Sequence, residues 1–308
     1  MLTTPVIRCL KQQLKNSEIH YLTKKPYLPI LQANPYIDKI HLLDNGFNYL
    51  ISSLQKEEFD YVIDLHKNLR SFQIKMRLRK PSCSFDKLNL KKWLLVNFKI
   101  NSLPKVHIVD RYLETVKHFG VTNDFQGLDY FIPDEESVNL DLLPAPFNHG
   151  YTAFVIGGQH TTKKMPTEKI ISICRKIANP VILLGGKEDA EAGEKISSHA
   201  GRDKVLNACG KYTINQSASI VKQAKNIISH DTGLMHIAAA FKKDITSIWG
   251  NTIPDFGMAP YFPGKNSFIA EVKDLPCRPC SKIGYGKCPK KHFFCMNLID
   301  EVEVVDKS

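Results

Sequence analysis

Residues 229–240 read SHDTGLMHIAAA and place Asp231, Thr232 and Gly233 between a predicted strand and a predicted helix, with His236 one turn later. Unpaired N–H groups at a helix start attract anions, and a glycine there lets a diphosphate approach the backbone closely. We expect Asp231 to cap the helix and His236 to project from the same face as Thr232. The alternative is an ordinary capped helix with a histidine in the core.

A second polar segment, GGQHTTKKMP at 157–166, follows another predicted strand. The hydroxyls of Thr161 and Thr162 can donate hydrogen bonds to phosphate oxygens. Either Lys163 or Lys164 can neutralise the phosphate charge. Taken alone, the segment could also be a polar loop.

A third strand end, LLGGKED at 183–189, supplies Glu188. In nucleotide-binding folds an acidic residue at such a position accepts hydrogen bonds from the ribose, although it could instead be a carboxylate that stabilises the helix start. Ligands of doubly wound sheets bind beyond the carboxyl ends of the strands, so the three segments together indicate one ligand site. Neither GxGxxG nor GxxxxGK[ST] is present, so no motif supports a dehydrogenase or a P-loop enzyme.

The elements that must position these residues alternate regularly from about residue 151. Short apolar strands separated by single helices predict an α/β fold with a parallel sheet and helices on both faces. The predicted strands cover 151–156, 180–186, 204–209, 226–231 and 245–250, and the predicted helices cover 167–178, 188–199, 215–224 and 232–241.

The first half of the chain follows a similar but less regular pattern. A doubly wound domain normally opens on a strand, whereas this chain opens on a helix that Thr3 or Thr4 would cap, so we expect the N-terminal domain to lack its first strand. Two prolines and a glycine at 141–150 predict an interdomain linker. The predicted helices are 3–15, 47–57 and 68–79, and the predicted strands are 18–23, 39–44 and 60–66.

Composition fits a globular, basic protein of 308 residues with 43% hydrophobic residues and a formal charge of +11. The chain shows no signal peptide and no apolar run of the roughly 20 residues that span a bilayer, so we expect it in the cytoplasm. Residues 66–105 hold one acid and eleven basic residues, a density that attracts phosphates but also fits a solvated surface. The basic residues are Lys67, Arg70, Lys75, Arg77, Arg79, Lys80, Lys87, Lys91, Lys92, Lys99 and Lys105.

Four cysteines cluster near the C-terminus, at Cys277, Cys280, Cys288 and Cys295. The first pair has the spacing of a zinc knuckle, and four thiolates could close a tetrahedral structural site. The second pair is more widely spaced than usual, so reduced thiols or a disulfide remain alternatives.

SHDTGLMHIAAA together with KKMP resembles glycosyltransferase family 9, the lipopolysaccharide heptosyltransferases, which have the two-domain GT-B fold. LTTPVIRCLK at the start, VIDLHKNLRS at 62–71 and the CRPC…CP…HFFCM region are similar to further parts of that family. Where the family has an aromatic residue before the proline, this chain has Met165.

The resemblance implies an inverting enzyme, peripheral to the inner face of the cytoplasmic membrane. It would transfer heptose from an ADP-activated donor to an inner-core sugar of a lipid A precursor. Residues 1–145 would bind the acceptor, with Lys67 and Arg70 facing its phosphates, and residues 146–308 would bind the donor. No cofactor beyond a structural zinc is expected. The implied donor-binding residues are Thr161, Thr162, Lys163, Glu188, Asp231, Thr232, Gly233 and His236.

The general base is the open question. In the family it follows the opening strand that we expect to be missing, and Asp64 is the nearest other carboxylate. The alternative function is a catalytically inactive protein that binds a nucleotide sugar or a lipid head group. A nucleic-acid binder would leave the three ligand-shaped strand ends unexplained, so we expect no nucleic-acid partner.

Overall fold

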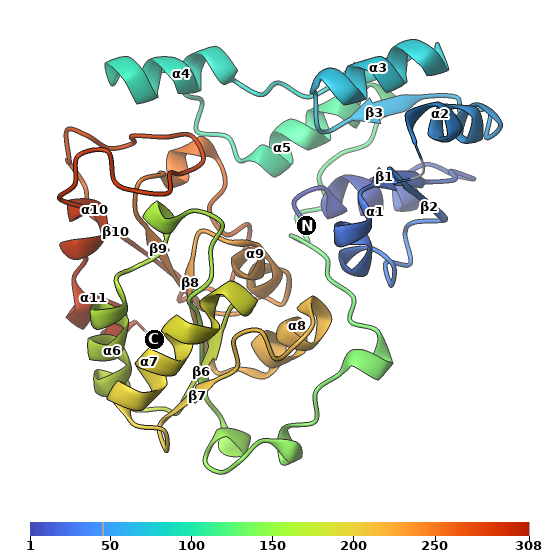
Figure 1. The fold of residues 1–308 in the computed structure, drawn as a ribbon. Helices are drawn as coiled ribbons and strands as arrows, with labels where there is room; N and C mark the ends of the chain where they lie inside the picture. Colours follow the sequence, from blue (N-terminus) through green and yellow to red (C-terminus); the bar gives the residue numbers. More distant parts are fainter. Residues whose placement is uncertain (45, 308) are drawn as a thin grey trace. The chain divides into compact units, whose positions relative to one another are not determined.

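The computed structural model describes residues 1–44 and 46–307, and the chain forms two compact units (Figure 1). The first unit comprises residues 1–89 and 106–131, and the second comprises 90–105 and 132–308. Within the described part of the chain, no helix combines the length and apolar character needed to cross a bilayer.

The second unit contains a six-stranded sheet in the order β10-β9-β8-β5-β6-β7, with every pair parallel. The predicted α/β fold with a parallel sheet is therefore confirmed. The chain fills one side of β5 and then the other, so β5 and β8 flank the topological switch point. Its strands are β5 (Thr152–Val155), β6 (Val181–Leu184), β7 (Val205–Asn207), β8 (Asn226–His230), β9 (Ile245–Trp249) and β10 (Phe268–Glu271). The sequence pattern did not predict β10, a half-exposed edge strand.

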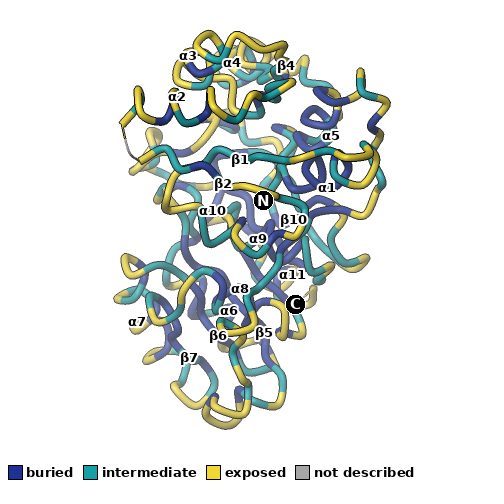
Figure 2. Tube along the Cα trace, turned by 90° about the vertical axis from the view of Figure 1, so that its right-hand side faces the viewer, coloured by how far each residue is buried: buried dark blue, intermediate teal, exposed yellow. Residues whose placement is uncertain are grey.

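Helices cover both faces of this sheet (Figure 1). Helices α6, α7 and α11 pack together on one face, and α8 and α9 pack together on the other. Strands β5 and β6 are buried along their whole length, as the dark tube of Figure 2 shows, which explains why they consist mostly of apolar residues. The helices are α6 (Thr167–Lys176), α7 (Ala190–Ala200), α8 (Ile214–Gln223), α9 (Gly233–Ala240), α10 (Phe294–Asn297) and α11 (Glu301–Asp306).

The first unit contains two separate two-stranded parallel sheets, β1-β2 and β3-β4. The predicted elements of this half all form, with shorter bounds, while β4 and α5 were not predicted. Helix α1 has Thr3 at its N-cap, although the Thr3 side chain makes no capping hydrogen bond. The elements are α1 (Thr4–Gln13), β1 (His20–Thr23), β2 (Lys39–Leu42), α2 (Phe47–Gln55), β3 (Val62–Asp64), α3 (Leu69–Leu78), β4 (Ser82–Ser84) and α5 (Ile108–Leu113).

Helix α4 (Asn89–Phe98) and the residues after it pack with the second unit, although the first unit precedes and follows them in the chain. The Lys99 Nζ donates to the carbonyl oxygens of Cys277 (3.3 Å) and Pro279 (2.7 Å). The Lys92 ammonium lies 5.6 Å from the ring centre of Phe256, a cation–π distance. The basic segment 66–105 is thus divided between the two units.

A buried arginine links two segments of the first unit that are distant in sequence. Arg8, on α1, has a side chain that is only 2% exposed. Its Nε and Nη2 donate to the two carboxylate oxygens of Asp124 at 2.7 and 2.9 Å, and Nη2 also donates to the Gly127 carbonyl (2.9 Å). Asp129 forms a second ion pair with Nη1. These bonds fix α1 against the 124–129 segment.

Arg8→Met should lower the free energy of unfolding by about 3–5 kcal/mol, because it leaves two carboxylates without their cation. The midpoint of urea unfolding, followed by circular dichroism, measures the change. Arg202→Met is the matched control, since the Arg202–Glu194 pair is mostly exposed and should contribute less than about 1 kcal/mol. Equal midpoints for the Arg8 and Arg202 variants would contradict the structural role of Arg8.

Candidate functional site

Two adjacent lysines after β5 reach opposite neighbours of that strand. The Lys163 Nζ donates to Asp231 Oδ2 at the end of β8 (2.6 Å), and the Lys164 Nζ donates to Asp189 Oδ1 after β6 (2.5 Å). They diverge because β5 lies between β8 and β6 in the sheet. The two ion pairs join three strand ends at the switch point, where a doubly wound sheet binds its ligand.

The loop that carries the lysines is fixed to β8 by His230. The Met165 N–H donates to His230 Nε2 (3.0 Å), and the His230 ring is fully buried. Burial lowers the pKa of His230 to about 4, so the ring is neutral near pH 7 and its Nε2 can accept this bond. The Met165 side chain is buried in the core.

We expected Asp231 to cap helix α9, but the structure shows that it does not. Thr232 occupies the N-cap position, and its side chain makes no capping hydrogen bond. The Asp231 carboxylate instead accepts bonds from Lys163 and from the Thr252 hydroxyl (3.1 Å). The charged bond to lysine replaces the expected capping bond, so neither Asp231 nor Thr232 caps the start of α9.

The start of α9 leaves room for a ligand. A methyl group built on Gly233 would meet no atom within 4 Å, so the backbone is open there. His236, one turn later, is 6% exposed, so most of its ring is covered by protein. The structure places both residues on α9, as predicted.

The two threonines of the loop differ in their surroundings. Thr161 is exposed, whereas Thr162 is buried. The Thr162 hydroxyl donates to the Tyr285 carbonyl (3.1 Å) and accepts from the Tyr285 N–H (2.8 Å). Its hydrogen-bonding capacity therefore serves to hold the 285 segment against the loop, and Thr161 is the hydroxyl that faces solvent.

After β6, Glu188 is exposed and its neighbour Asp189 is buried. Asp189 binds Lys164 and accepts a bond from the Gly186 N–H (2.9 Å). A methyl group on Gly157 or on Gly185 would lie 2.8 Å from the Asp189 carboxylate, which explains the glycines at these strand ends. Asp189 is thus structural, and Glu188 is the acid with access to solvent.

The sequence did not predict which residue holds Thr252 in place beside Asp231. The Arg278 side chain, 6% exposed, donates to the carbonyl oxygens of Gly250 (2.6 Å) and Thr252 (2.9 Å) and to Glu271 (2.6 Å). These bonds fix the loop after β9, which presents the Thr252 hydroxyl to Asp231. Arg278 lies within the CRPC segment, whose cysteine spacing predicted a zinc site.

In the first unit, Asp64 is held as a structural carboxylate. Its Oδ1 accepts from the N–H groups of His66 (3.0 Å) and Lys67 (2.7 Å), and its Oδ2 binds Ser71 (3.0 Å) and Lys75 (3.0 Å). Burial raises the pKa of Asp64, but the hydrogen bonds outweigh it and hold the pKa below its ordinary value. A carboxylate in this state is a poor general base, so the geometry argues against that hypothesis.

The four clustered cysteines carry free thiols. Among the described residues, the one group of three metal-ligating side chains within reach of a common ion is His20, His41 and Glu57, which includes no cysteine. Burial raises the pKa of Cys295 to about 12, so a metal ion bound there would have to displace the thiol proton. The zinc site at the cysteines stays a prediction.

The free energy of unfolding should fall as the pH drops from about 6.5 toward 4, because the unfolded chain binds a proton at His230 that the folded chain excludes. The contribution is full above pH 6.5, and its slope cannot exceed about 1.4 kcal/mol per pH unit. Urea unfolding at several pH values measures it. His230→Gln keeps an acceptor for Met165 and should flatten the slope, whereas His199→Gln, at an exposed site, should not. Identical slopes in both variants would contradict this account.

The chain is similar to known proteins over most of its length. A model of glycosyltransferase family 9 (heptosyltransferase) matches residues 48–285. Lipopolysaccharide heptosyltransferase 1 of Campylobacter coli is 25% identical, over 97% of this chain and 92% of the relative. A family 9 glycosyltransferase from Veillonella parvula has a TM-score of 0.76, with 21% identity over 99% of this chain and 91% of that one. The ADP-heptose lipopolysaccharide heptosyltransferase II of Escherichia coli has a TM-score of 0.73, with 17% identity over 99% and 92%. Both neighbours share the GT-B fold that the sequence predicted. The chain belongs to glycosyltransferase family 9, the heptosyltransferase family, and is a glycosyltransferase.

Proposed function

We propose that this enzyme transfers heptose from an ADP-activated donor to an inner-core sugar of lipopolysaccharide, with inversion at the anomeric carbon. The Escherichia coli relative is named for ADP-heptose, and the Campylobacter coli relative for lipopolysaccharide. The observation that carries the proposal is the position of Lys163, held by Asp231 at the switch point beside the uncapped start of α9.

The donor diphosphate would be bound by three kinds of hydrogen-bond donor. The Lys163 ammonium donates one of its three N–H groups to Asp231, and the side chain is 17% exposed. Two N–H groups therefore remain for phosphate oxygens. Thr161 offers a hydroxyl, and the first N–H groups of α9 offer backbone donors next to Gly233. Glu188 would accept from the ribose hydroxyls. In this arrangement Asp231 orients the lysine.

The reaction forms one bond and breaks one. An acceptor hydroxyl oxygen attacks the anomeric carbon, the bond from that carbon to the diphosphate oxygen breaks, and ADP leaves with the electron pair while the hydroxyl loses its proton to a base. Attack opposite the leaving group inverts the configuration. Negative charge grows on the leaving oxygen, and the Lys163 ammonium and the start of α9 stabilise it in a fixed geometry.

A buried amide next to the site supports a ligand there. Asn251 is 1% exposed, and within the described part of the chain neither its Oδ1 nor its Nδ2 has a hydrogen-bond partner. It lies in the loop after β9, next to Thr252, the residue that binds Asp231. Since a buried amide without a partner is costly, a bound ligand or water is the expected partner of Asn251.

Lys163→Ala should weaken ADP binding at least about 10-fold, because a charged hydrogen bond contributes about 1.5–3 kcal/mol. It should lower the rate of transfer further, since the lysine also stabilises the leaving group. Calorimetry with ADP and mass spectrometry of an ADP-heptose reaction measure the two effects. Lys195→Ala is the matched control, because Lys195 forms a similar ion pair with Glu168 on the exposed side of the same unit. Full activity of Lys163→Ala, or tight donor binding by the native chain without any transfer, would contradict the proposal.

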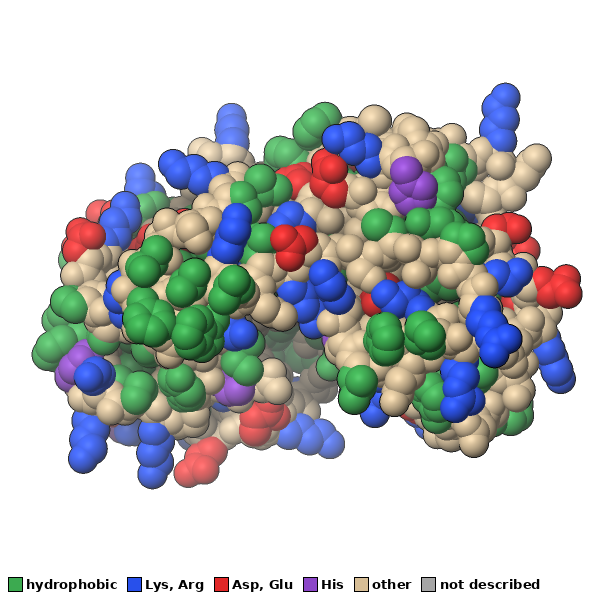
Figure 3. Space-filling view, turned by 90° about the horizontal axis from the view of Figure 1, so that it is seen from above, with side chains coloured by type: hydrophobic (Ala, Val, Ile, Leu, Met, Phe, Trp, Pro, Cys, Tyr) green, Lys and Arg blue, Asp and Glu red, His purple; other side chains and the backbone are tan. Residues whose placement is uncertain are grey.

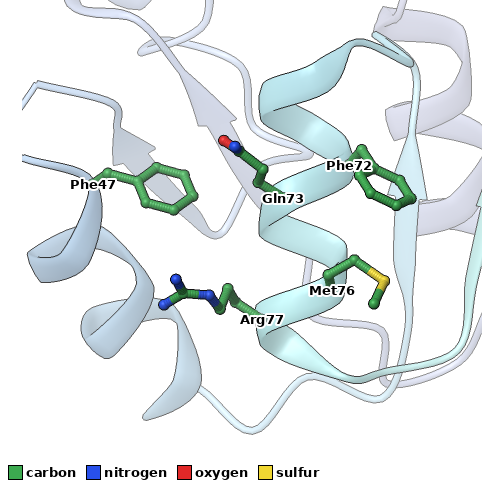
Figure 4. Close-up of a pocket in the computed structure, with 5 residues that line it drawn as sticks. All are labelled: Phe47, Phe72, Gln73, Met76 and Arg77. Atoms are coloured by element: carbon green, nitrogen blue, oxygen red, sulfur yellow. The ribbon is translucent and has the colours of Figure 1, made fainter.

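Membrane association would follow from the outer face of α3. Leu69, Phe72 and Met76 are 74%, 54% and 61% exposed, and their spacing forms one apolar stripe along the helix. Figure 3 shows hydrophobic side chains among lysines and arginines on the face seen from above. Figure 4 shows Gln73 and Arg77 directed away from Phe72 and Met76 and toward α2, where Phe47 completes a shallow surface hollow.

The charge around this stripe suits an anionic lipid surface. Lys67 and Arg70 are exposed at the start of α3, and Arg77 and Arg79 are exposed near its end. Apolar side chains can enter the interface while cationic ones bind lipid phosphates, at about 1 kcal/mol per charge. We propose that this face meets the membrane in which the acceptor lipid lies.

The triple variant Leu69→Ser, Phe72→Ser, Met76→Ser should sediment with vesicles rich in anionic phospholipid several-fold less than the native chain, because it removes the inserting side chains. Leu142→Ser, at another exposed apolar residue, should behave like the native chain. Binding to zwitterionic vesicles should be weak for all three proteins. Equal sedimentation of the triple variant and the native chain would overturn the assignment of this face.

A further inference from the structure

The first unit contains a cluster of two histidines and a glutamate that the transfer reaction does not use. His20 opens β1, His41 lies on β2, and Glu57 follows α2. In the parallel pair, His20 is opposite Lys39 and His41 is opposite Leu22. Alternate residues of a strand share a face, so both imidazoles project from the same face of this sheet, two positions apart.

The three side chains are close enough to hold one ion. One ligand atom of each lies within 4.8 Å of the others. His20 Nδ1 is 3.0 Å from His41 Nε2 and 3.8 Å from Glu57 Oε2. Ligands at 2.0–2.2 Å from a tetrahedral zinc ion lie roughly 3.3 Å apart, and the two separations from His20 Nδ1 are close to that value.

The proton arrangement of His20 suits metal binding. Its outer nitrogen, Nε2, lies 2.8 Å from Glu18 Oε1. A carboxylate at this nitrogen holds the proton there and leaves the lone pair on Nδ1, the atom that faces His41. This carboxylate–histidine pair is the usual second layer of a metal site. Only one proton fits between the two facing nitrogens, and a cation can take its place.

Neighbouring residues hold the cluster in position. Phe59 packs edge-on against both rings, with centroids 5.2 Å from His20 and 6.2 Å from His41. The Lys39 Nζ binds Glu57 Oε1 at 2.5 Å, which leaves Oε2 for the histidines. His41 is 7% exposed, so the protein covers most of its ring.

We propose that His20, His41 and Glu57 form a zinc site in the first unit, with water as the fourth ligand. Two imidazoles and one carboxylate suit zinc better than magnesium or calcium, which prefer oxygen ligands. The ion would tie β1, β2 and the residue after α2 together. The site belongs to the first unit, whereas the donor-binding strand ends belong to the second.

Cobalt substitution distinguishes this site from the cysteines. The full chain is stripped with chelator and titrated with Co²⁺. Nitrogen and oxygen ligands give weak visible bands only, whereas thiolates add intense charge-transfer absorption in the near ultraviolet. We expect one equivalent with visible bands that His41→Gln abolishes, and at least 10-fold weaker binding in Glu57→Gln. Thiolate absorption alone, or no cobalt bound at all, would overturn the proposal.

Zinc-dependent thermal unfolding gives a second readout. The unfolding midpoint of the stripped native chain should rise with added Zn²⁺, because the ion binds the folded state. His118→Gln, at an exposed histidine of the same unit, should keep this rise, and Glu57→Gln should lose most of it. If His41→Gln fails to fold, Glu57→Gln decides, since Glu57 is partly exposed and its amide is isosteric. An unchanged rise in Glu57→Gln would overturn the proposal.

Discussion

The arrangement of the strand ends in the second unit depends on two consecutive lysines, Lys163 and Lys164, in the loop that follows β5. The loop leaves the central strand, and its lysines bind carboxylates on the strands to either side. Each pair is mostly covered, with side chains between 4% and 26% exposed. Opposite charges at such sites are costly to separate, so the three strand ends keep a fixed spacing. These strand ends would form the base of a diphosphate-binding site.

Other residues of the second unit hold these strand ends in position. His230 ties the loop to β8 through a neutral ring, and Arg278 fixes the loop that presents Thr252 to Asp231. Glycines at the strand ends are required because the Asp189 carboxylate fills the space a side chain would need. Polar groups on Lys163, Thr161, Glu188, Asn251 and the start of α9 remain for a ligand after these bonds are made. They are donors and acceptors of the kind a nucleotide sugar needs.

The sequence predicted the second unit well because its strands are buried on both faces and its helices have one apolar side. Such strands are rich in apolar residues, and among the described strands of this unit only β10, half-exposed at the edge, was not predicted. The motifs also indicated which strand ends carry chemistry. The sequence did not predict that Asp231 binds Lys163 and not the helix start, because that choice depends on a residue 68 positions away. Arg278 and the His20–His41–Glu57 cluster were missed for the same reason, since each is assembled from distant segments.

The path of residues 90–105 gives the chain an unusual connectivity. The polypeptide passes between the units at 89/90, again at 105/106 and a third time at 131/132. A fragment that begins at residue 132 would contain the whole six-stranded sheet but would lack α4. The carbonyl oxygens of Cys277 and Pro279 would lose the lysine that binds them, and Phe256 would lose the ammonium beside its ring. The units are thus interleaved in sequence, and a cut at one boundary cannot release either of them whole.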